Sequence, residues 1–304
     1  MRLPILLLLV AACDRGHREQ SAPLPSSAKP APAAGCTLAA IPTRVALTPK
    51  RLVAIGDLHG DLAGARAALR AAGAIDDGDH WIGGDLVIVQ TGDVLDRGDD
   101  ESAILELLER LDRDARQAGG AVIQLLGNHE LMNPAGDFRY VTPGGMRDFG
   151  GDRTHALAPG GAWAKRLATH NVVAIVGGNV FSHAGVLANW VTHVDELNLA
   201  TRCWLDGQAG DAHQPPPALA ADDSPVWTRD YGIPERVDCA ALKQVLDKLG
   251  GNRMIVGHTV QEKGITSACD GALWRIDVGL AKLYNGPIEV LELGDAPRVV
   301  RGTR

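Results

Sequence analysis

From about residue 50 onward, the chain repeats one pattern: a short apolar run, a turn rich in Gly, Asp and His, and often an amphipathic stretch. Runs of about four to eight apolar or β-branched residues are typical of buried strands, and longer amphipathic stretches are typical of helices. Such alternation predicts a layered α/β fold. The expected strands are 51–55, 86–90, 121–126, 172–176, 179–182, 253–256, 273–278 and 288–293. The expected helices are 62–72, 101–118 and 240–249.

Two long stretches interrupt this pattern. Residues 131–165 are rich in Gly, Pro and Arg, and residues 187–238 contain a polar helical segment followed by three consecutive prolines. Long loops are uncommon inside a compact domain unless they serve a function. Both inserts are therefore expected to form the walls or lid of a substrate cleft.

The turns that follow the expected strands carry the residues with the most chemistry. They read GDLHG at 56–60, GDVLDRG at 92–98, GNHE at 127–130, HAG at 183–185 and GHT at 257–259. α/β sheets bind their ligands at the carboxyl ends of the strands, where these turns lie. Oxygen and imidazole donors without a thiolate suit divalent manganese, iron or zinc.

These five motifs, in this order, resemble the signature of the PPP phosphatases and the wider calcineurin-like metallophosphoesterases. The resemblance runs from about residue 51 to 293. In the segments after GNHE and around Trp227, the sequence resembles the bacterial Shewanella-like protein phosphatases. It implies a sandwich of two central β-sheets flanked by helices. It also implies a metal-dependent phosphoesterase that hydrolyses phosphomonoesters through a metal-bridging hydroxide. Within this class, the resemblance implies a protein phosphatase that prefers phosphotyrosine.

The same resemblance implies a division of labour among the motif residues. Two divalent metal ions are expected, with Asp93 as the bridging ligand. The remaining expected ligands are Asp57 and His59 for one metal, and Asn128, His183 and His258 for the other. His129 is the expected general acid, and Asp96 is its expected carboxylate partner unless it only caps a turn.

Substrate phosphate is expected to contact Arg97 and Arg229, because guanidinium groups match phosphate oxygens. Asn128 is the third expected contact of the phosphate. Arg229 could instead be an ordinary surface residue. Glu130 is interpreted as a structural residue that fixes turn geometry, and Trp227 as core packing. For Asp277 and Tyr284, lining the site and a buried structural role remain equal alternatives.

The first 12 residues contain one positive residue, a short apolar run and small residues before Cys13, which is typical of a secretory signal. The run is shorter than the roughly 20 residues that span a bilayer. Val10-Ala11-Ala12-Cys13 resembles the lipobox of bacterial lipoproteins, although a plain signal peptide cut nearby is the alternative. We therefore expect an exported protein in the periplasm or cell envelope, attached to a membrane through lipidated Cys13.

Residues 13–44 are interpreted as the lipid anchor and a tether rich in Pro, Ala and Ser, followed by one metallophosphoesterase domain over 45–298. Four further cysteines remain at positions 36, 203, 239 and 269. An even number of cysteines in an exported protein favours disulfides, in one of three pairings, but four buried thiols remain the alternative.

The net charge of −7 and the absence of a basic run argue against a nucleic-acid partner. Phosphorylated proteins or small phosphoesters are the expected substrates. Two alternatives stay open: a nucleotide hydrolase resembling diadenosine tetraphosphatase, and a non-catalytic metal-binding lipoprotein. The mostly acidic and polar second insert argues against the former, and the presence of Asp96, Arg97 and His129 argues against the latter.

Overall fold

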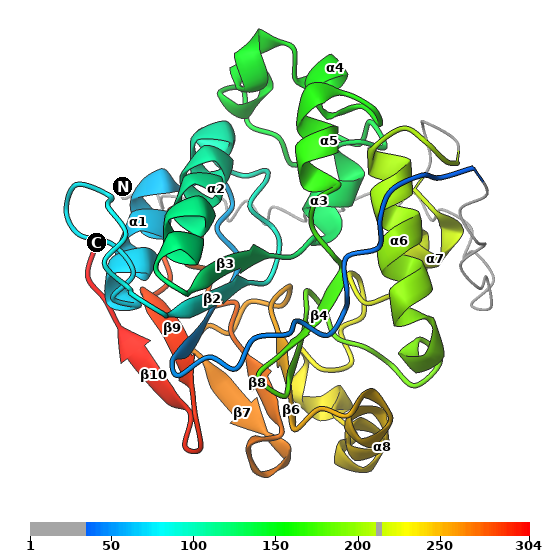
Figure 1. The fold of residues 1–304 in the computed structure, drawn as a ribbon. Helices are drawn as coiled ribbons and strands as arrows, with labels where there is room; N and C mark the ends of the chain where they lie inside the picture. The colour runs from blue at the N-terminus through cyan, green and yellow to red at the C-terminus, as the bar shows by residue number, and fades with distance from the viewer. Residues whose placement is uncertain (1–34, 211–214) are drawn as a thin grey trace, which may run out of the picture.

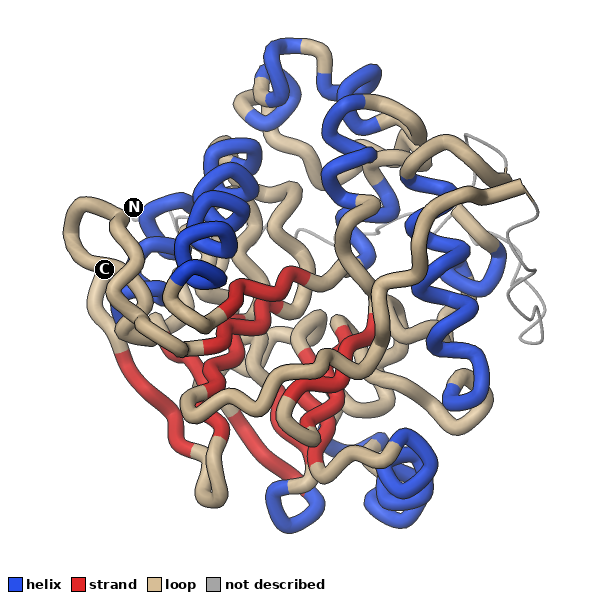
Figure 2. Tube along the Cα trace, in the orientation of Figure 1, coloured by secondary structure: helices blue, strands red, loops and turns tan. Residues whose placement is uncertain are grey.

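The computed structural model describes residues 35–210 and 215–304, and two five-stranded sheets occupy its centre (Figure 1). The expected signal peptide, Cys13 and most of the expected tether lie outside the described residues. Helices lie on the flanks of the sheets, as the tube in Figure 2 shows. The predicted sandwich of two sheets is therefore confirmed.

The first sheet has the strand order β10-β9-β1-β2-β3. The strands are β1 (Leu52–Ile55), β2 (Val87–Gln90), β3 (Ala121–Gln124), β9 (Glu289–Leu293) and β10 (Arg298–Arg301). The first three are parallel to one another, whereas β9 is antiparallel to both of its neighbours. The carboxyl ends of β1, β2 and β3 consequently meet at one edge of the sheet.

The second sheet has the strand order β4-β5-β6-β8-β7. The strands are β4 (Val173–Val176), β5 (Asn179–Ser182), β6 (Arg253–Val256), β7 (Thr266–Ala268) and β8 (Leu273–Arg275). β5, β6 and β8 are parallel, and β4 and β7 are antiparallel edge strands.

Alternation along the strands builds two cores. Along β1, Leu52 and Ala54 pack between the two sheets with residues such as Phe181 and Ile255 of the second sheet. Val53 and Ile55 point the other way, into the larger core under the helices. Successive side chains of a strand point to opposite faces, so strands that are apolar throughout fit a sheet buried on both faces.

The three expected helices form with nearly the predicted limits. They are α1 (Leu62–Ala71), α2 (Glu101–Gln117) and α8 (Cys239–Leu249). Asp61 and Asp238 cap α1 and α8 by accepting backbone N–H bonds with their side chains. In Figure 1, α1 and α2 lie beside the first sheet, and α8 lies near β6 of the second.

Both inserts contain short helices. The first insert carries η1 (Gly145–Arg147), η2 (Phe149–Gly151), α4 (Arg153–Leu157) and α5 (Ala162–Leu167), following α3 (Asn128–Met132). The second carries η3 (Val191–His193), α6 (Val194–Leu205), α7 (Pro217–Ala220) and η4 (Pro234–Arg236). Apart from the 12-residue α6, which lies within the expected polar helical segment, these helices contain too few turns to produce a clear periodic signal in sequence.

Two edge strands were absent from the sequence prediction. β7 reads Thr-Ser-Ala, and β10 reads Arg-Val-Val-Arg with both arginines exposed. Edge strands that are short and charged resist pairing with other chains, but they lack the apolar pattern that reveals a strand. Because β10 reaches residue 301, the expected domain end at 298 is too early.

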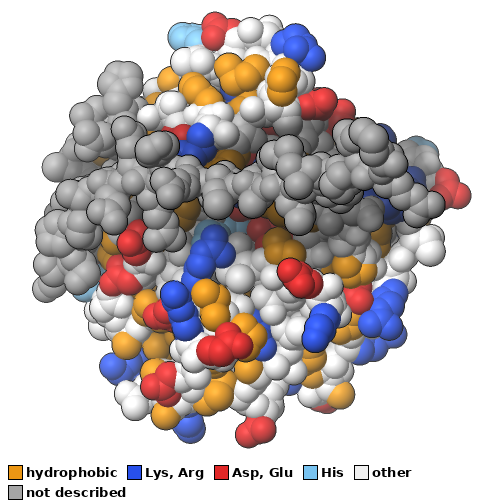
Figure 3. Space-filling view, turned by 180° about the vertical axis from the view of Figure 1, so that it is seen from behind, with side chains coloured by type: hydrophobic (Ala, Val, Ile, Leu, Met, Phe, Trp, Pro, Cys, Tyr) orange, Lys and Arg blue, Asp and Glu red, His pale blue; other side chains and the backbone are white. Residues whose placement is uncertain are grey.

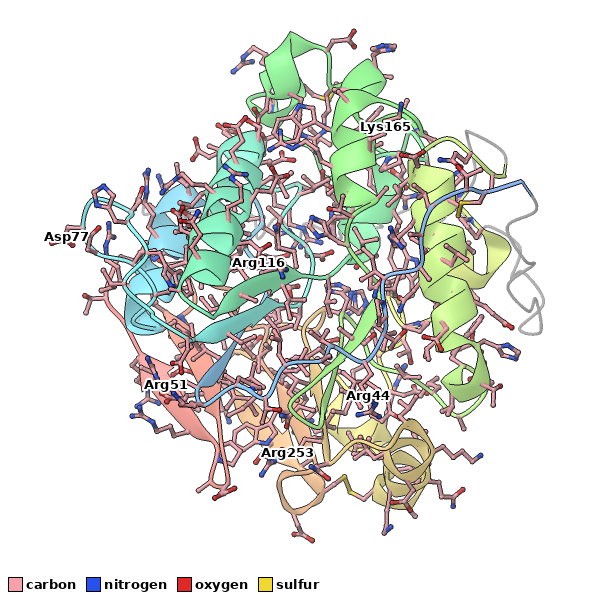
Figure 4. All side chains as sticks on the ribbon, in the orientation of Figure 1. Arg44, Arg51, Asp77, Arg116, Lys165 and Arg253 are labelled. Atoms are coloured by element: carbon pink, nitrogen blue, oxygen red, sulfur yellow. A yellow bond between two sulfur atoms is a disulfide. The ribbon has the colours of Figure 1, made fainter. Side chains whose placement is uncertain are left out.

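The expected boundary after residue 44 is corrected for a similar reason. Cys36 forms a disulfide with Cys203 of α6, and the Arg202 guanidinium donates to the carbonyl of Ala39. Arg44, labelled in Figure 4, donates to the carbonyl of Leu249 at the end of α8. Residues 36–44 are thus attached to the domain rather than forming part of a free tether.

The four cysteines of the described chain form two disulfides. Besides Cys36–Cys203, Cys239 at the start of α8 is bonded to Cys269 in η5 (Cys269–Gly271). The alternative of four free thiols is therefore wrong.

Among the helices of residues 35–210 and 215–304, none is long and apolar enough to cross a membrane. On the coloured part of the face in Figure 3, hydrophobic side chains lie between charged ones of both signs.

Candidate metal and phosphoester site

Parallel strand ends bring the five motifs together. Asp57 follows β1, Asp93 follows β2, and His183 and His258 follow β5 and β6. The Asp93 carboxylate lies at the centre: its Oδ2 is 3.7 Å from His59 Nε2 and 3.3 Å from His183 Nε2. His183 Nε2 is in turn 3.1 Å from His258 Nδ1. The expected bridging ligand therefore lies within 3.7 Å of an expected ligand of each metal, His59 for one and His183 for the other.

The two remaining expected ligands complete these groups. Asn128 Oδ1 lies 2.9 Å from His183 Nε2, and Asp57 Oδ2 lies 4.0 Å from His59 Nε2. Asp57, His59, Asp93, Asn128 and His183 are all buried. The structure thus gathers all six expected metal ligands in one place.

The buried carboxylates of this cluster repel one another. Burial, followed by the charges of Asp277 and Asp93, raises the pKa of Asp57 well above its ordinary value. Burial lowers the pKa of His59 to about 4 and that of His258 to about 2, so both imidazoles are neutral and have a lone pair to offer. Carboxylate oxygens and neutral imidazoles fit divalent cations, whose charge would remove the repulsion.

Backbone strain is concentrated at the same place. Ten residues other than glycine have positive φ in the described chain. Five of them belong to the motifs: His59 (43°), Asp93 (58°), Asp96 (67°), Arg97 (67°) and His258 (66°). Such conformations cost about 1 to 3 kcal/mol each and tend to persist at functional sites.

Two motif glycines are required because side chains approach their backbone closely. A Cβ at Gly127 would lie 2.1 Å from Asp93 Oδ1, and a Cβ at Gly257 would lie 2.3 Å from Asp57 Oδ1. Any larger residue would therefore push an expected metal ligand out of position.

Glu130 holds the turn that carries the bridging ligand. Its carboxylate accepts hydrogen bonds from four backbone N–H groups, those of Asp93, Val94, Leu95 and Gly127, at 2.7–3.0 Å. These contacts fit the structural interpretation of Glu130.

His129 and Asp96 form a buried dyad. His129 Nδ1 is 2.5 Å from Asp96 Oδ2, and both side chains are almost fully enclosed. Burial disfavours the imidazolium, but the Asp93 and Asp96 carboxylates outweigh it and raise the pKa of His129. Asp96 thus makes the carboxylate contact expected from the sequence.

Comparison with known proteins agrees with this geometry. Residues 50–262 match the family of calcineurin-like phosphoesterases, which is more than half of the chain. The chain belongs to the calcineurin-like phosphoesterase family. It is a metal-dependent phosphatase that acts on phosphorylated substrates.

Relatives of this phosphoesterase include Shewanella-like protein phosphatases. It is 40% identical over 295 residues to Shewanella-like protein phosphatase 2 of Arabidopsis thaliana, covering 81% of this chain and 75% of that protein. It is 32% identical over 250 residues to Shewanella-like protein phosphatase 1 of Plasmodium berghei, covering 77% of this chain and 68% of that protein. The resemblance to Shewanella-like phosphatases is thereby confirmed.

Solved structures give the same result. A cold-active protein tyrosine phosphatase of a Shewanella species is 26% identical, with a TM-score of 0.72, covering 86% of this chain and 83% of that one. A protein serine/threonine phosphatase of Saccharomyces cerevisiae has a TM-score of 0.58 at 15% identity, covering 86% of this chain and 83% of that one. The second comparison supports the fold alone.

The phosphoesterase has a small pocket of about 60 Å³ above its metal-ligand cluster. Arg97 enters this pocket with its guanidinium 4.9 Å from the ring centre of Tyr140 and 5.3 Å from that of Tyr284. Arg97 Nε is buried and has no hydrogen-bond partner among the described residues. A buried donor without a partner fits a guanidinium that receives an anion.

Both inserts of the phosphoesterase contribute to this pocket. Tyr140 comes from the first insert, and Trp227 and Arg229 come from the second. Arg229 is exposed and donates to Thr259 Oγ1 at 3.1 Å, so it lies at the pocket rather than elsewhere on the surface. Asp277 and Tyr284 also line the pocket.

Sequence reasoning missed three contributors to the site. Trp227 was interpreted as core packing, yet its half-buried ring also lines the pocket, 6.0 Å from the His258 ring. Asn133 and Arg153 both contact Asp96, although neither belongs to a motif. In sequence, Arg153 is one of several arginines in the insert that follows the GNHE motif. Nothing local distinguishes it from the surface arginines of the same segment.

Proposed function

We propose that this phosphoesterase is a protein phosphatase that prefers phosphotyrosine and binds two divalent metal ions of manganese, iron or zinc, with manganese as the ion expected in vitro. Asp57, His59, Asp93, Asn128, His183 and His258 would hold them. Such a pair of ions, when bound, supplies Lewis-acid activation of water and of the phosphoryl group. The single observation that carries the proposal is the buried ligand cluster lying beneath a pocket with aromatic walls.

The protein side chains supply the remaining steps. Arg97, with Arg229 at the rim and Asn128 beneath, binds the phosphoryl oxygens and orients the ester. His129 donates a proton to the leaving oxygen, and Asp96 holds the imidazole by accepting from Nδ1. Arg97 Nη2 donates to His129 Nε2 at 3.1 Å, and a phosphoryl group bound by Arg97 would take over this donor, so that Nε2 beside it can carry the proton for the leaving oxygen.

Tyr140 supports the preference for phosphotyrosine. Tyr140 is 43% exposed, and its ring centre lies 5.2 Å from that of His129, the proposed proton donor to the leaving group. An aryl leaving group can stack against this ring, whereas the short serine side chain does not reach as far. The similarity to a cold-active protein tyrosine phosphatase supports the same substrate.

Matched peptides with phosphotyrosine or phosphoserine, assayed with manganese, test this preference. The phosphotyrosine peptide is expected to have the higher kcat/KM. Tyr140→Ala should lower kcat/KM for phosphotyrosine about threefold to tenfold more than for phosphoserine, the range of an aromatic pair. Tyr140→Phe keeps the ring and serves as the control.

Three outcomes would contradict parts of this proposal. Equal values for the two peptides remove the tyrosine preference and leave the phosphatase activity. A clear preference for diadenosine tetraphosphate would favour the nucleotide hydrolase. Binding of metal without turnover of any phosphoester would favour a non-catalytic lipoprotein, although Asp96, Arg97 and His129 are all in place for catalysis.

We also propose that the protein is exported and anchored to a membrane through lipidated Cys13. The lipobox-like sequence supports this proposal, and so do the disulfides Cys36–Cys203 and Cys239–Cys269, because disulfides persist in oxidising compartments.

Cys13→Ser is expected to release the protein from membranes or to leave it unprocessed, because acyl chains would provide the anchor. Cell fractionation and mass spectrometry of the mature N-terminus measure this. Cys36→Ser tests whether loss of any cysteine has the same effect, and it should leave the protein in the membrane fraction. An unmodified N-terminus after a different cleavage site would refute the anchor.

A further inference from the structure

Arg153 is a fully buried arginine that connects the first insert to the catalytic dyad. It begins α4, and its exposed fraction is 1%. Its Nη2 donates to Asp96 Oδ1 at 2.9 Å and to Glu101 Oε2 at 2.6 Å, while Nη1 donates to Glu101 Oε1 at 2.8 Å. Nε donates to Asn133 Oδ1 at 2.9 Å. Every nitrogen of the guanidinium is therefore hydrogen-bonded.

Asn133 closes the network on the other side. Its Nδ2 donates to Asp96 Oδ1 at 2.8 Å and to the carbonyl of His129 at 3.0 Å. Asp96 Oδ1 thus accepts from two donors, whereas the hydrogen bond described for Oδ2 comes from His129 Nδ1. With Oδ1 held twice, the carboxylate cannot rotate, and Oδ2 stays directed at the imidazole.

We propose that Arg153 is a positioning residue for phosphoester cleavage, which fixes the Asp96 carboxylate so that His129 keeps its Nε2 directed at the leaving oxygen. The proposal rests on the proposed role of His129 as the proton donor. The insert would then take part in catalysis from its buried side through Arg153, in addition to lining the pocket through Tyr140.

Stability alone does not account for this arrangement. A buried ion pair costs desolvation that can exceed its Coulomb attraction, and apolar residues of the same volume are often as stable. The planar guanidinium fork, by contrast, can hold Glu101 with two nitrogens and still reach Asp96 with one of them. Lysine, with one nitrogen, cannot reproduce this geometry.

The test compares two substrates that differ in their leaving group. Phenyl phosphate needs a proton donor more than 4-nitrophenyl phosphate, because the nitro group stabilises the departing phenoxide. Arg153→Met is expected to lower kcat for both substrates, and the decrease for phenyl phosphate should be about tenfold or more larger than that for 4-nitrophenyl phosphate. A general acid contributes about 10²- to 10⁴-fold to the rate, and misplacing His129 would remove a part of this contribution. KM should change little, because Arg153 does not contact the pocket.

Arg202→Met is the matched control. Arg202 is also a buried arginine, but its guanidinium donates to the carbonyls of Ala168 and Ala39, away from the dyad. This variant should lose stability without changing the ratio of the two substrates. If Arg153→Met does not fold, Arg153→Lys serves the same comparison with a smaller change in volume, and the same shift in the ratio is expected.

Two further measurements separate positioning from general destabilisation. In an Asp96→Asn background, Arg153→Met should cause no additional change in the substrate ratio, because both residues act through one carboxylate. In ¹H NMR spectra of the zinc-loaded protein, the downfield His129 Nδ1–H signal should be lost in Asp96→Asn, shifted in Arg153→Met and unchanged in Arg202→Met.

The outcomes are distinct. The proposal is overturned if Arg153→Met lowers both substrates by the same factor, or if its effect on the ratio persists without Asp96. It falls together with the proton-donor role if His129→Asn, measured in parallel, leaves the ratio unchanged. The phosphotyrosine preference is independent of this result, because both test substrates are aryl phosphates.

Discussion

Asp93→Asn is expected to reduce turnover of 4-nitrophenyl phosphate by at least about 10³-fold while the protein stays folded, because Lewis-acid stabilisation amounts to several kcal/mol. The Asp93 carboxylate lies within 3.7 Å of imidazole nitrogens from His59, His129 and His183. Its negative charge therefore lies close to expected ligands of both metals. An amide keeps the shape of the side chain but removes this charge.

Metal content should fall along with activity, as measured by elemental analysis of the purified protein. Asp238→Asn is the control, since asparagine caps a helix about as well as aspartate and Asp238 caps α8 away from the site. Circular dichroism would verify that both variants are folded. Normal activity with two metals bound in Asp93→Asn would refute the role of Asp93 as the bridging ligand.

His129→Asn is expected to have the second largest effect and to depend on the leaving group. For a phosphoserine peptide, kcat should fall by about 10²- to 10⁴-fold, because an alkoxide needs a proton to depart. For 4-nitrophenyl phosphate the fall should be far smaller. Asparagine cannot donate the proton, although its side chain is still polar and of similar size.

Steady-state kinetics on both substrates measures this difference. Asp96→Asn should shift the substrate ratio in the same direction, since Asp96 Oδ2 orients the imidazole at 2.5 Å. Equal losses on the alkyl and aryl substrates would assign His129 to metal binding or structure instead. That alternative has a physical basis, because His129 Nε2 is 3.7 Å from Asp93 Oδ2.

The inner strands and the metal-ligand cluster could be predicted because their signals are local. β1, β2 and β6 are short apolar runs that end at glycine turns, and a buried strand needs nothing more in sequence to be recognised. Parallel strands place their carboxyl ends together, so Asp57 after β1 and Asp93 after β2 meet at one edge of the first sheet, and packing of the second sheet brings His258 after β6 to them.

The edge strands could not be predicted in this way. β7 and β10 are held by backbone hydrogen bonds to one neighbour, and their side chains bury little apolar surface. Nothing in Thr-Ser-Ala or Arg-Val-Val-Arg distinguishes these segments from a polar loop. Their pairing follows from the position of β8 and β9 once the sheets exist.

By itself, the sequence determined the order of the motifs, the types of metal-binding side chain and the layered α/β alternation, because each is read from residues close together along the chain; the two-sheet arrangement was implied by the family resemblance of those motifs. Only the tertiary structure decided how Cys36 and Cys203 pair and that Arg153 holds Asp96, 57 positions away. The physical reason is that packing brings distant segments into contact at distances of a few ångströms, and no local pattern records which donor will meet which acceptor. Arg153, one arginine in a loop by sequence, acquires its partners only when the insert folds over the dyad.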